Sequence, residues 1–123
     1  MNKYLVIVLM LCFNYSKAQN ESNVTFQFLK KIDDINYLYD SKNKSTIDSL
    51  KRKIDKSQND TIKGYFYRVQ SKIFVNQLDY DAALKSLDKS ISFYKKANNS
   101  LGIVKSMMNK GGVLYQKGET KKA

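Results

Sequence analysis

The chain has 123 residues, enough for one small domain, and it contains no His and a single Cys at position 12. The commonest general base, His, is therefore absent, and the readiest nucleophile, Cys, occurs once. We expect no enzyme, no metal and no cofactor. The net charge of +11 favours anionic partners, but the lysines are spread along the chain, which is typical of a solvated basic surface.

The first eighteen residues have the pattern of a signal peptide. Lys3 supplies the positive start, and an apolar run from Tyr4 to Phe13 is too short to span a bilayer comfortably. Small residues at Ser16 and Ala18 predict cleavage after Ala18. The mature chain then begins near Gln19, and its charge falls from +11 to +9 because two lysines and no acidic residue are lost.

Export from a bacterium, to the periplasm or the medium, is the localisation that this segment predicts. Two alternatives stay open for it. In the first alternative, the segment is a buried helix or strand at the N-terminus of the fold. In the second, it belongs to a lipoprotein modified at Cys12, although Leu11 is bulky where a small residue is expected.

Residues 19–60 are predicted to form a degenerate pair of helices. In the first, residues 23–40, one face carries Val24, Phe28, Ile32, Ile35 and Tyr39, with Ser22 as N-cap. A polar break at residues 40–44 precedes a capping box at residues 45–48, formed by Ser45 and Asp48. The second helix carries the apolar residues Ile47, Leu50 and Ile54.

Residues 61–123 are more strongly patterned. After a break at residues 57–59 we expect Asp60 to cap a helix over residues 61–77, and Asp79 to cap the next helix. A break and cap at residues 98–100 precede a last helix, which is predicted to stop at Gly118. Five helices, short polar connections and no strand-like alternation predict an all-α fold in which consecutive helices are antiparallel.

Two segments of this region correspond at a spacing of about forty residues. A small residue stands at Ser71 and again at Gly111, large apolar residues follow, and Ala83 recurs as Ala123. The turn residues 78–80 correspond to the Gly-acid pair at residues 118–119. The small residues should let paired helices approach closely, while Tyr67, Phe74 and Met107 fill the space between them.

These motifs resemble tetratricopeptide repeats in a variant with a period near forty. The resemblance covers residues 61–123, the last repeat being incomplete, and departs from the family at Leu78, where Gly is usual, and at Lys110, where an apolar residue is common. It implies antiparallel helical hairpins stacked as an α-solenoid, and we expect this N-terminal piece to continue in a larger exported protein. Other α-solenoids and bundles are built from similar short helices and stay open as alternatives.

The resemblance also implies a function, the binding of a protein or an acidic peptide in a groove lined by the first helix of each repeat. The candidate groove residues are Tyr65, Arg68, Lys72, Asn76, Lys105, Met108, Tyr115 and Gln116. Arg68, Lys72 and Asn76 are four residues apart and form one row on a helix, suited to carboxylates. Self-association through the uncapped last repeat is a further expectation.

A second hypothesis makes the chain the periplasmic sensory region of a membrane-bound histidine kinase or a helix-turn-helix transcriptional regulator, with its output domain beyond residue 123. Membrane attachment is expected only through such a downstream region. No nucleic-acid partner is expected, because the basic residues are not densely clustered and export argues against it.

Overall fold

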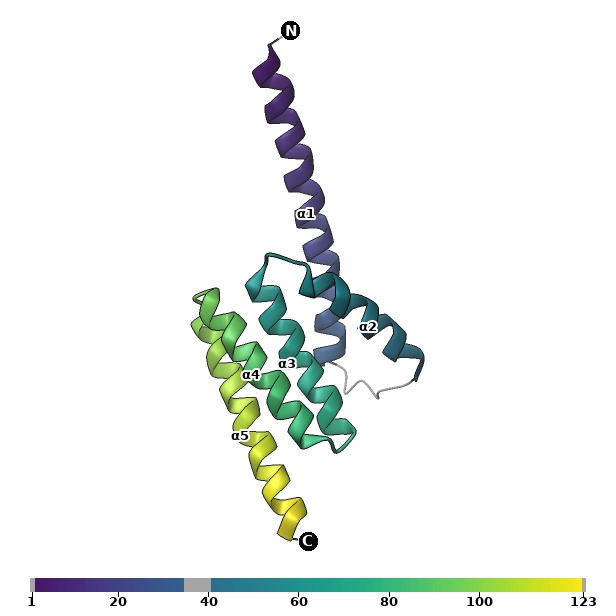
Figure 1. The fold of residues 1–123 in the computed structure, drawn as a ribbon, viewed down its shortest axis with the longest axis vertical. Coiled ribbons are helices and arrows are strands. Elements are labelled where there is room, and N and C mark those ends of the chain that lie inside the picture. The colour runs from purple at the N-terminus through teal and green to yellow at the C-terminus, as the bar shows by residue number, and fades with distance from the viewer. Residues whose placement is uncertain (1, 35–40, 123) are drawn as a thin grey trace.

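The computed structural model describes the backbone of residues 2–34 and 41–122, and the side chains of residues 2–15, 26–27, 29–30 and 47–120. The described backbone forms five α-helices, and the all-α prediction is confirmed (Figure 1). They are α1 (Lys3–Asp34), α2 (Ser41–Asp55), α3 (Asp60–Asn76), α4 (Tyr80–Lys96) and α5 (Ser100–Lys122). Consecutive helices from α3 to α5 pack antiparallel, whereas a repeated or solenoid architecture stays a prediction.

The two connections within α3–α5 are built in the same way. Leu78 and Asn98 both adopt left-handed conformations, with φ of 60° and 52°. The following N–H groups, of Asp79 and Asn99, each donate at 2.9 Å to the carbonyl five residues earlier, which closes a Schellman motif. The same two side chains then cap the next helix, Asp79 accepting from Ala82 N at 3.1 Å and Asn99 from Gly102 N at 2.9 Å. The caps predicted at Asp79 and within residues 98–100 are confirmed.

Three other predicted helix starts are wrong. Ser22 and Ser45 lie inside α1 and α2, because the residues before them include no Pro or Gly that would interrupt a helix. The cap of α3 is Asn59, whose side chain accepts from Ile62 N at 3.1 Å, and Asp60 is the first helical residue. The stripe residues Ile35 and Tyr39, and Asp40 at the start of the predicted break, lie outside the described residues.

The predicted helix end at Gly118 is also wrong, because α5 continues to Lys122. Gly118 does not adopt a positive φ, and the Thr120 hydroxyl donates to Gln116 O at 2.9 Å within the last turns. Lys117 forms an ion pair with Asp81 of α4 at 2.5 Å, which holds this part of α5 beside α4. The turn expected at residues 118–119 is therefore not formed, and Ala123 lies outside the described residues.

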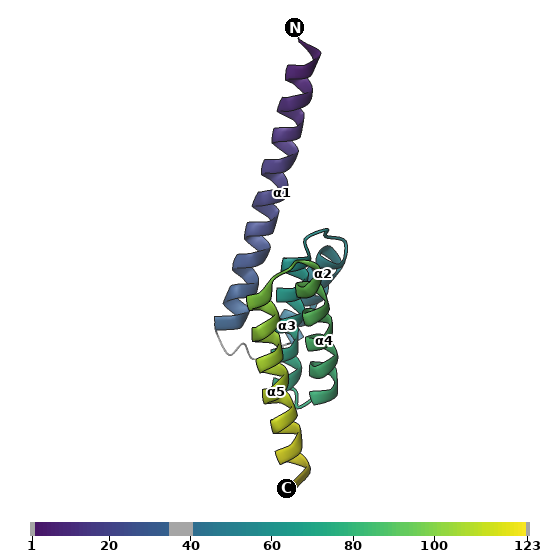
Figure 2. The same cartoon turned by 90° about the vertical axis from the view of Figure 1, so that its left-hand side faces the viewer.

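The core has two parts, both built on the central helices. The larger joins α1, α2 and α3 through eight buried residues, Leu29, Ile47, Ile54, Ile62, Phe66, Tyr67, Val69 and Ile73. The smaller joins α4 and α5 through Ala83, Leu87 and Val113, with Phe74 of α3 packed against them. Among the described residues, α1 and α2 thus both pack on α3, and α1 and α4 lie on opposite sides of it (Figure 2).

The N-terminal half of α1 projects away from the other helices (Figure 1). Its large apolar side chains between residues 4 and 15 are all exposed, including Leu5, Leu9 and Phe13 at 56%, 51% and 77%. Within the described residues, no helix has both the length and the apolar character required to cross a membrane. The assignment of residues 1–18 to a signal peptide stays a prediction.

Candidate functional site

A buried column of small residues sets the spacing of α3 and α5 on α4. The Ser90 hydroxyl of α4 donates to Gly64 O of α3 at 2.6 Å and lies 2.8 Å from the Ser106 hydroxyl of α5. One turn further along α4, the Tyr94 ring lies against both Gly64 and Gly102, where an added Cβ would come within 2.8 Å and 2.4 Å of ring atoms. Three helices therefore meet at van der Waals distance, and α3 and α5 are held side by side.

The α3 members of the predicted groove set differ in exposure. Tyr65 is half-buried and its ring stacks on Phe26 of α1, with centroids 5.3 Å apart. Arg68 is only 8% exposed, and its guanidinium lies 5.2 Å from the centre of the Tyr65 ring, a cation–π distance. Lys72 is half-buried and Asn76 is exposed. The chain's own α1 thus covers the N-terminal part of this row, which sequence reasoning missed.

The α5 members of the set are all exposed. Lys105 and Gln116 are exposed, Met108 is 71% exposed and Tyr115 is 70% exposed. The residues of α5 that pack toward α4 are Gly102, Ser106 and Val113. Met108 and Tyr115 lie on the opposite side of the helix, and Lys105 and Gln116 lie between the two sides. The structure therefore leaves an accessible surface with apolar, aromatic and cationic groups on α5, and Lys72 and Asn76 belong to α3, which packs beside it.

Some small residues behave as predicted and others do not. Ser71 and Ala83 are buried at 1% and 0% exposure, and Tyr67 is buried between helices, as expected. Gly111 has nothing within 4 Å of an added Cβ, and Met107 is 57% exposed, so neither mediates helix packing within the described residues. Lys110, the residue that departs from the family pattern, forms an ion pair with Asp88 of α4 at 2.6 Å.

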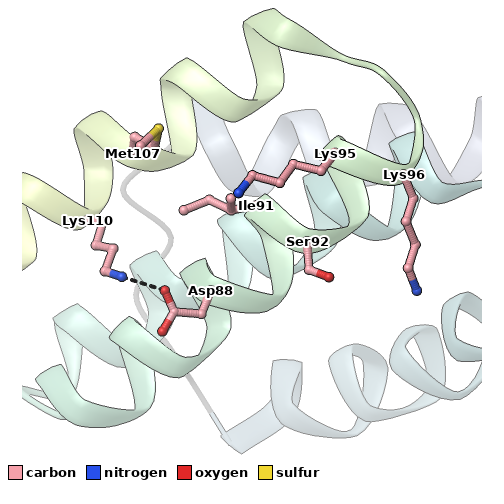
Figure 3. Close-up of a pocket in the computed structure, with 7 residues that line it drawn as sticks. All are labelled: Asp88, Ile91, Ser92, Lys95, Lys96, Met107 and Lys110. Carbon is pink, nitrogen blue, oxygen red and sulfur yellow. Dashed lines mark hydrogen bonds and ion pairs between the residues drawn. The ribbon is translucent and has the colours of Figure 1, made fainter.

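A second surface lies between α4 and α5, and sequence reasoning did not single it out. It is a groove of about 560 Å³ (Figure 3). Its lining residues are Asp88, Ile91, Ser92, Lys95, Lys96, Met107 and Lys110. In Figure 3 the Lys95 side chain ends beside Ile91, whereas Lys96 points away from α5. The signal in the sequence was Met107 itself, a large apolar residue that was expected to fill the space between paired helices. In the structure this side chain is exposed instead.

A hydrogen bond between two side chains with shifted pKa values joins α2 to α3. The Tyr67 hydroxyl donates to Asp55 Oδ1 at 2.7 Å, and Lys51 Nζ lies 2.7 Å from Asp55 Oδ2. Burial, together with the hydrogen bond to Asp55, raises the pKa of the Tyr67 phenol well above its ordinary value of 10.0. Burial by itself would raise the pKa of Asp55, but the hydrogen bonds from Lys51 and Tyr67 outweigh it, and the pKa is lowered from 3.8.

We expect Asp55→Asn to reduce the free energy of unfolding at pH 7 by no more than about 1 kcal/mol, because the carboxylate is 40% exposed to solvent. Because the pKa of the Asp55 carboxyl is lower in the folded state than its ordinary value of 3.8, the ionised carboxylate stabilises the fold at every pH above 3.8. This contribution is lost as the pH falls through the lowered pKa. Urea unfolding of both proteins from pH 7 toward pH 2 measures the difference, which should shrink with acid.

Tyr67→Phe is the matched control, because it removes the hydroxyl but keeps the ring stacked on Phe93 at 5.6 Å. It should resemble Asp55→Asn at pH 7. A difference between the wild type and Asp55→Asn that stays constant down to pH 2 would contradict the assignment.

The described residues contain no group of three or more His, Cys, Asp or Glu side chains arranged to hold a metal ion. No protein-family model, no curated protein and no solved structure matches the chain. The tetratricopeptide family is therefore not shown and remains a prediction. What the described residues establish is a small all-helical domain of five helices in which consecutive helices pack together.

Proposed function

We propose that this chain is a non-catalytic, exported interaction module that binds a peptide or protein segment on the face shared by α3 and α5. The observation that carries the proposal is the exposure of the α5 candidates, above all Met108 at 71% and Tyr115 at 70%. Large apolar and aromatic side chains on a soluble surface are typical of contact sites when they gather on one face. Lys105 on the same helix and Lys72 on α3 add positive charge.

The ligand that this chemistry favours is an acidic segment with one or two large apolar residues. The lysines attract carboxylates over several ångströms, and Met108 and Tyr115 offer apolar contact on the same helix as Lys105. Because Arg68 is 8% exposed, its part is to support Tyr65 rather than to meet the ligand directly. The sensory-region hypothesis concerns segments other than these residues, and no observation favours it.

We expect Lys72→Ala combined with Lys105→Ala to weaken binding of an acidic peptide by about tenfold, since two charge-assisted contacts are lost. The probe is a fluorescent peptide of about ten residues containing Glu, Leu and Phe, measured by polarisation at low and at physiological salt. A peptide of the same apolar residues with Lys in place of Glu should not bind.

The matched control is Lys53→Ala combined with Lys56→Ala, which removes two exposed lysines near the end of α2 and leaves the net charge of the protein the same as in the test variant. It should keep wild-type affinity. Equal weakening by both pairs would mean that net charge alone attracts the peptide, and the proposal would then fail.

A further inference from the structure

The α4–α5 groove continues onto an exposed apolar face of α5. Val104, Met107 and Leu114 are 52%, 57% and 51% exposed, and together with Gly111 they are spaced three, four and three residues apart, on one side of the helix. An added Cβ at Gly111 meets nothing within 4 Å, so another backbone can approach α5 closely at this point. This face is distinct from the one that carries Lys105 and Gln116.

The corresponding surface of α3 already docks a helix. Tyr67, Ser71 and Phe74 stand forty residues before Met107, Gly111 and Leu114. On α3 they meet α4: Tyr67 stacks on Phe93 at 5.6 Å, and Phe74 packs on the cluster that contains Ala83 and Leu87. A surface of large, small and large residues at this spacing therefore fits the apolar face of a helix that includes a small residue, as α4 includes Ala83.

The charges around the groove indicate which net charge a docked helix would carry. Lys95, Lys96 and Lys110 line it, and its single carboxylate, Asp88, is held by Lys110 at 2.6 Å. The apolar floor is formed by Ile91, which is half-buried, and Met107. The exposed Lys95 ammonium lies beside Ile91, where it would attract acidic residues on the edge of a docked helix and repel basic ones (Figure 3).

We propose that the α4–α5 groove, extended over Val104, Gly111 and Leu114, docks an acidic amphipathic helix of a partner protein. The apolar face of the helix lies on Met107 and Leu114, a small residue packs at Gly111, and glutamate or aspartate residues on its edge meet Lys95. The site borders the peptide-binding face proposed above, since Met108 and Tyr115 stand one helical turn from Val104 and Gly111, but the observations that support it are different ones.

The probe is a synthetic amphipathic peptide of about 18 residues, or five helical turns, with leucines and one central alanine on one face and glutamates at the edges. We expect saturable binding by the full chain, and binding about tenfold weaker for the same peptide with lysine in place of glutamate. Gly111→Leu should weaken binding of the acidic peptide by about tenfold or more, because the added side chain occupies the point of closest approach.

Gly112→Leu is the matched control, since Gly112 is the adjacent residue of α5, also has nothing within 4 Å, and points about 100° away from Gly111 around the helix. It should change the affinity by less than about threefold, and Lys95→Glu should weaken binding far more than Lys53→Glu. Circular dichroism of each variant checks that the helices are retained, and Met107→Ser serves as a second groove variant if Gly111→Leu unfolds.

Three results would overturn the proposal. The first is equal weakening by Gly111→Leu and Gly112→Leu, and the second is no saturable binding of the acidic peptide. The third is a concentration-dependent mass in analytical ultracentrifugation that Gly111→Leu abolishes, in the absence of peptide binding, which would assign the groove to a second copy of this chain.

Discussion

Leu87→Ala is expected to reduce the free energy of unfolding by about 2–5 kcal/mol, the usual cost of a cavity left by a buried leucine. Leu87 is 0% exposed and lies in the cluster that joins α4 to Val113 of α5 and to Phe74 of α3. Because a domain of this size is stable by about 5–15 kcal/mol in total, the variant should unfold at a much lower urea concentration. Circular dichroism at the helical band during urea titration measures the change.

Leu101→Ala is the control for this experiment. Leu101 is also on a helix, in the first turn of α5, but it is 64% exposed, so the same truncation should change stability by less than about 0.5 kcal/mol. Similar losses for the two variants would mean that α4 is not the helix on which α3 and α5 are packed.

Gly102→Ala is expected to destabilise the fold by about 1–3 kcal/mol, although alanine is the better helix former. Its Cβ would lie 2.4 Å from Cδ1 of Tyr94. The Tyr94 ring is 4% exposed and is held on its other side by Gly64, so it has no room to move. Overpacking at this point should push α5 away from α4, and thermal unfolding followed by circular dichroism records the loss.

The same helix provides the control, because Gly112→Ala makes the identical change at a position with nothing within 4 Å. There alanine should stabilise α5 by about 0.5–1 kcal/mol through its helix propensity. In a Tyr94→Leu background the penalty of Gly102→Ala should shrink, which a double-mutant cycle measures. Stabilisation by both glycine substitutions would contradict the close packing of Tyr94.

The two turns that join α3 to α4 and α4 to α5 were predictable because they depend on local chemistry. Asp79 and Asn99 cap helices with their own side chains. Ala83, Leu87 and Tyr94 of α4 are spaced four and seven residues apart, which is one face of a helix, and all three are buried. Signals of this kind act within a few residues, so the sequence contains them in full. The starts at Ser22 and Ser45 failed because a capping residue does not interrupt a helix that its neighbours can continue.

The candidate site was predictable only in part. The resemblance to tetratricopeptide repeats, rather than a local signal, assigned Lys105, Met108, Tyr115 and Gln116 to one accessible groove, and the structure leaves all four exposed. The position of Arg68 was not predictable, because its burial depends on tertiary packing rather than on the four-residue spacing of its row. Phe26 stacks on Tyr65 from a helix that begins far earlier in the chain, and no local pattern indicates that contact.

The sequence alone thus determined the helical class, the two turns that join α3, α4 and α5, and the apolar side of α4, since these follow from backbone propensity and period. Tertiary structure decided that α1 packs on α3, that Ser90 and Ser106 meet between three helices, and that α5 continues past Gly118. It also decided which apolar side chains are left exposed around Gly111. The physical reason is that burial is a property of pairs of surfaces, and a single helix does not specify its neighbour.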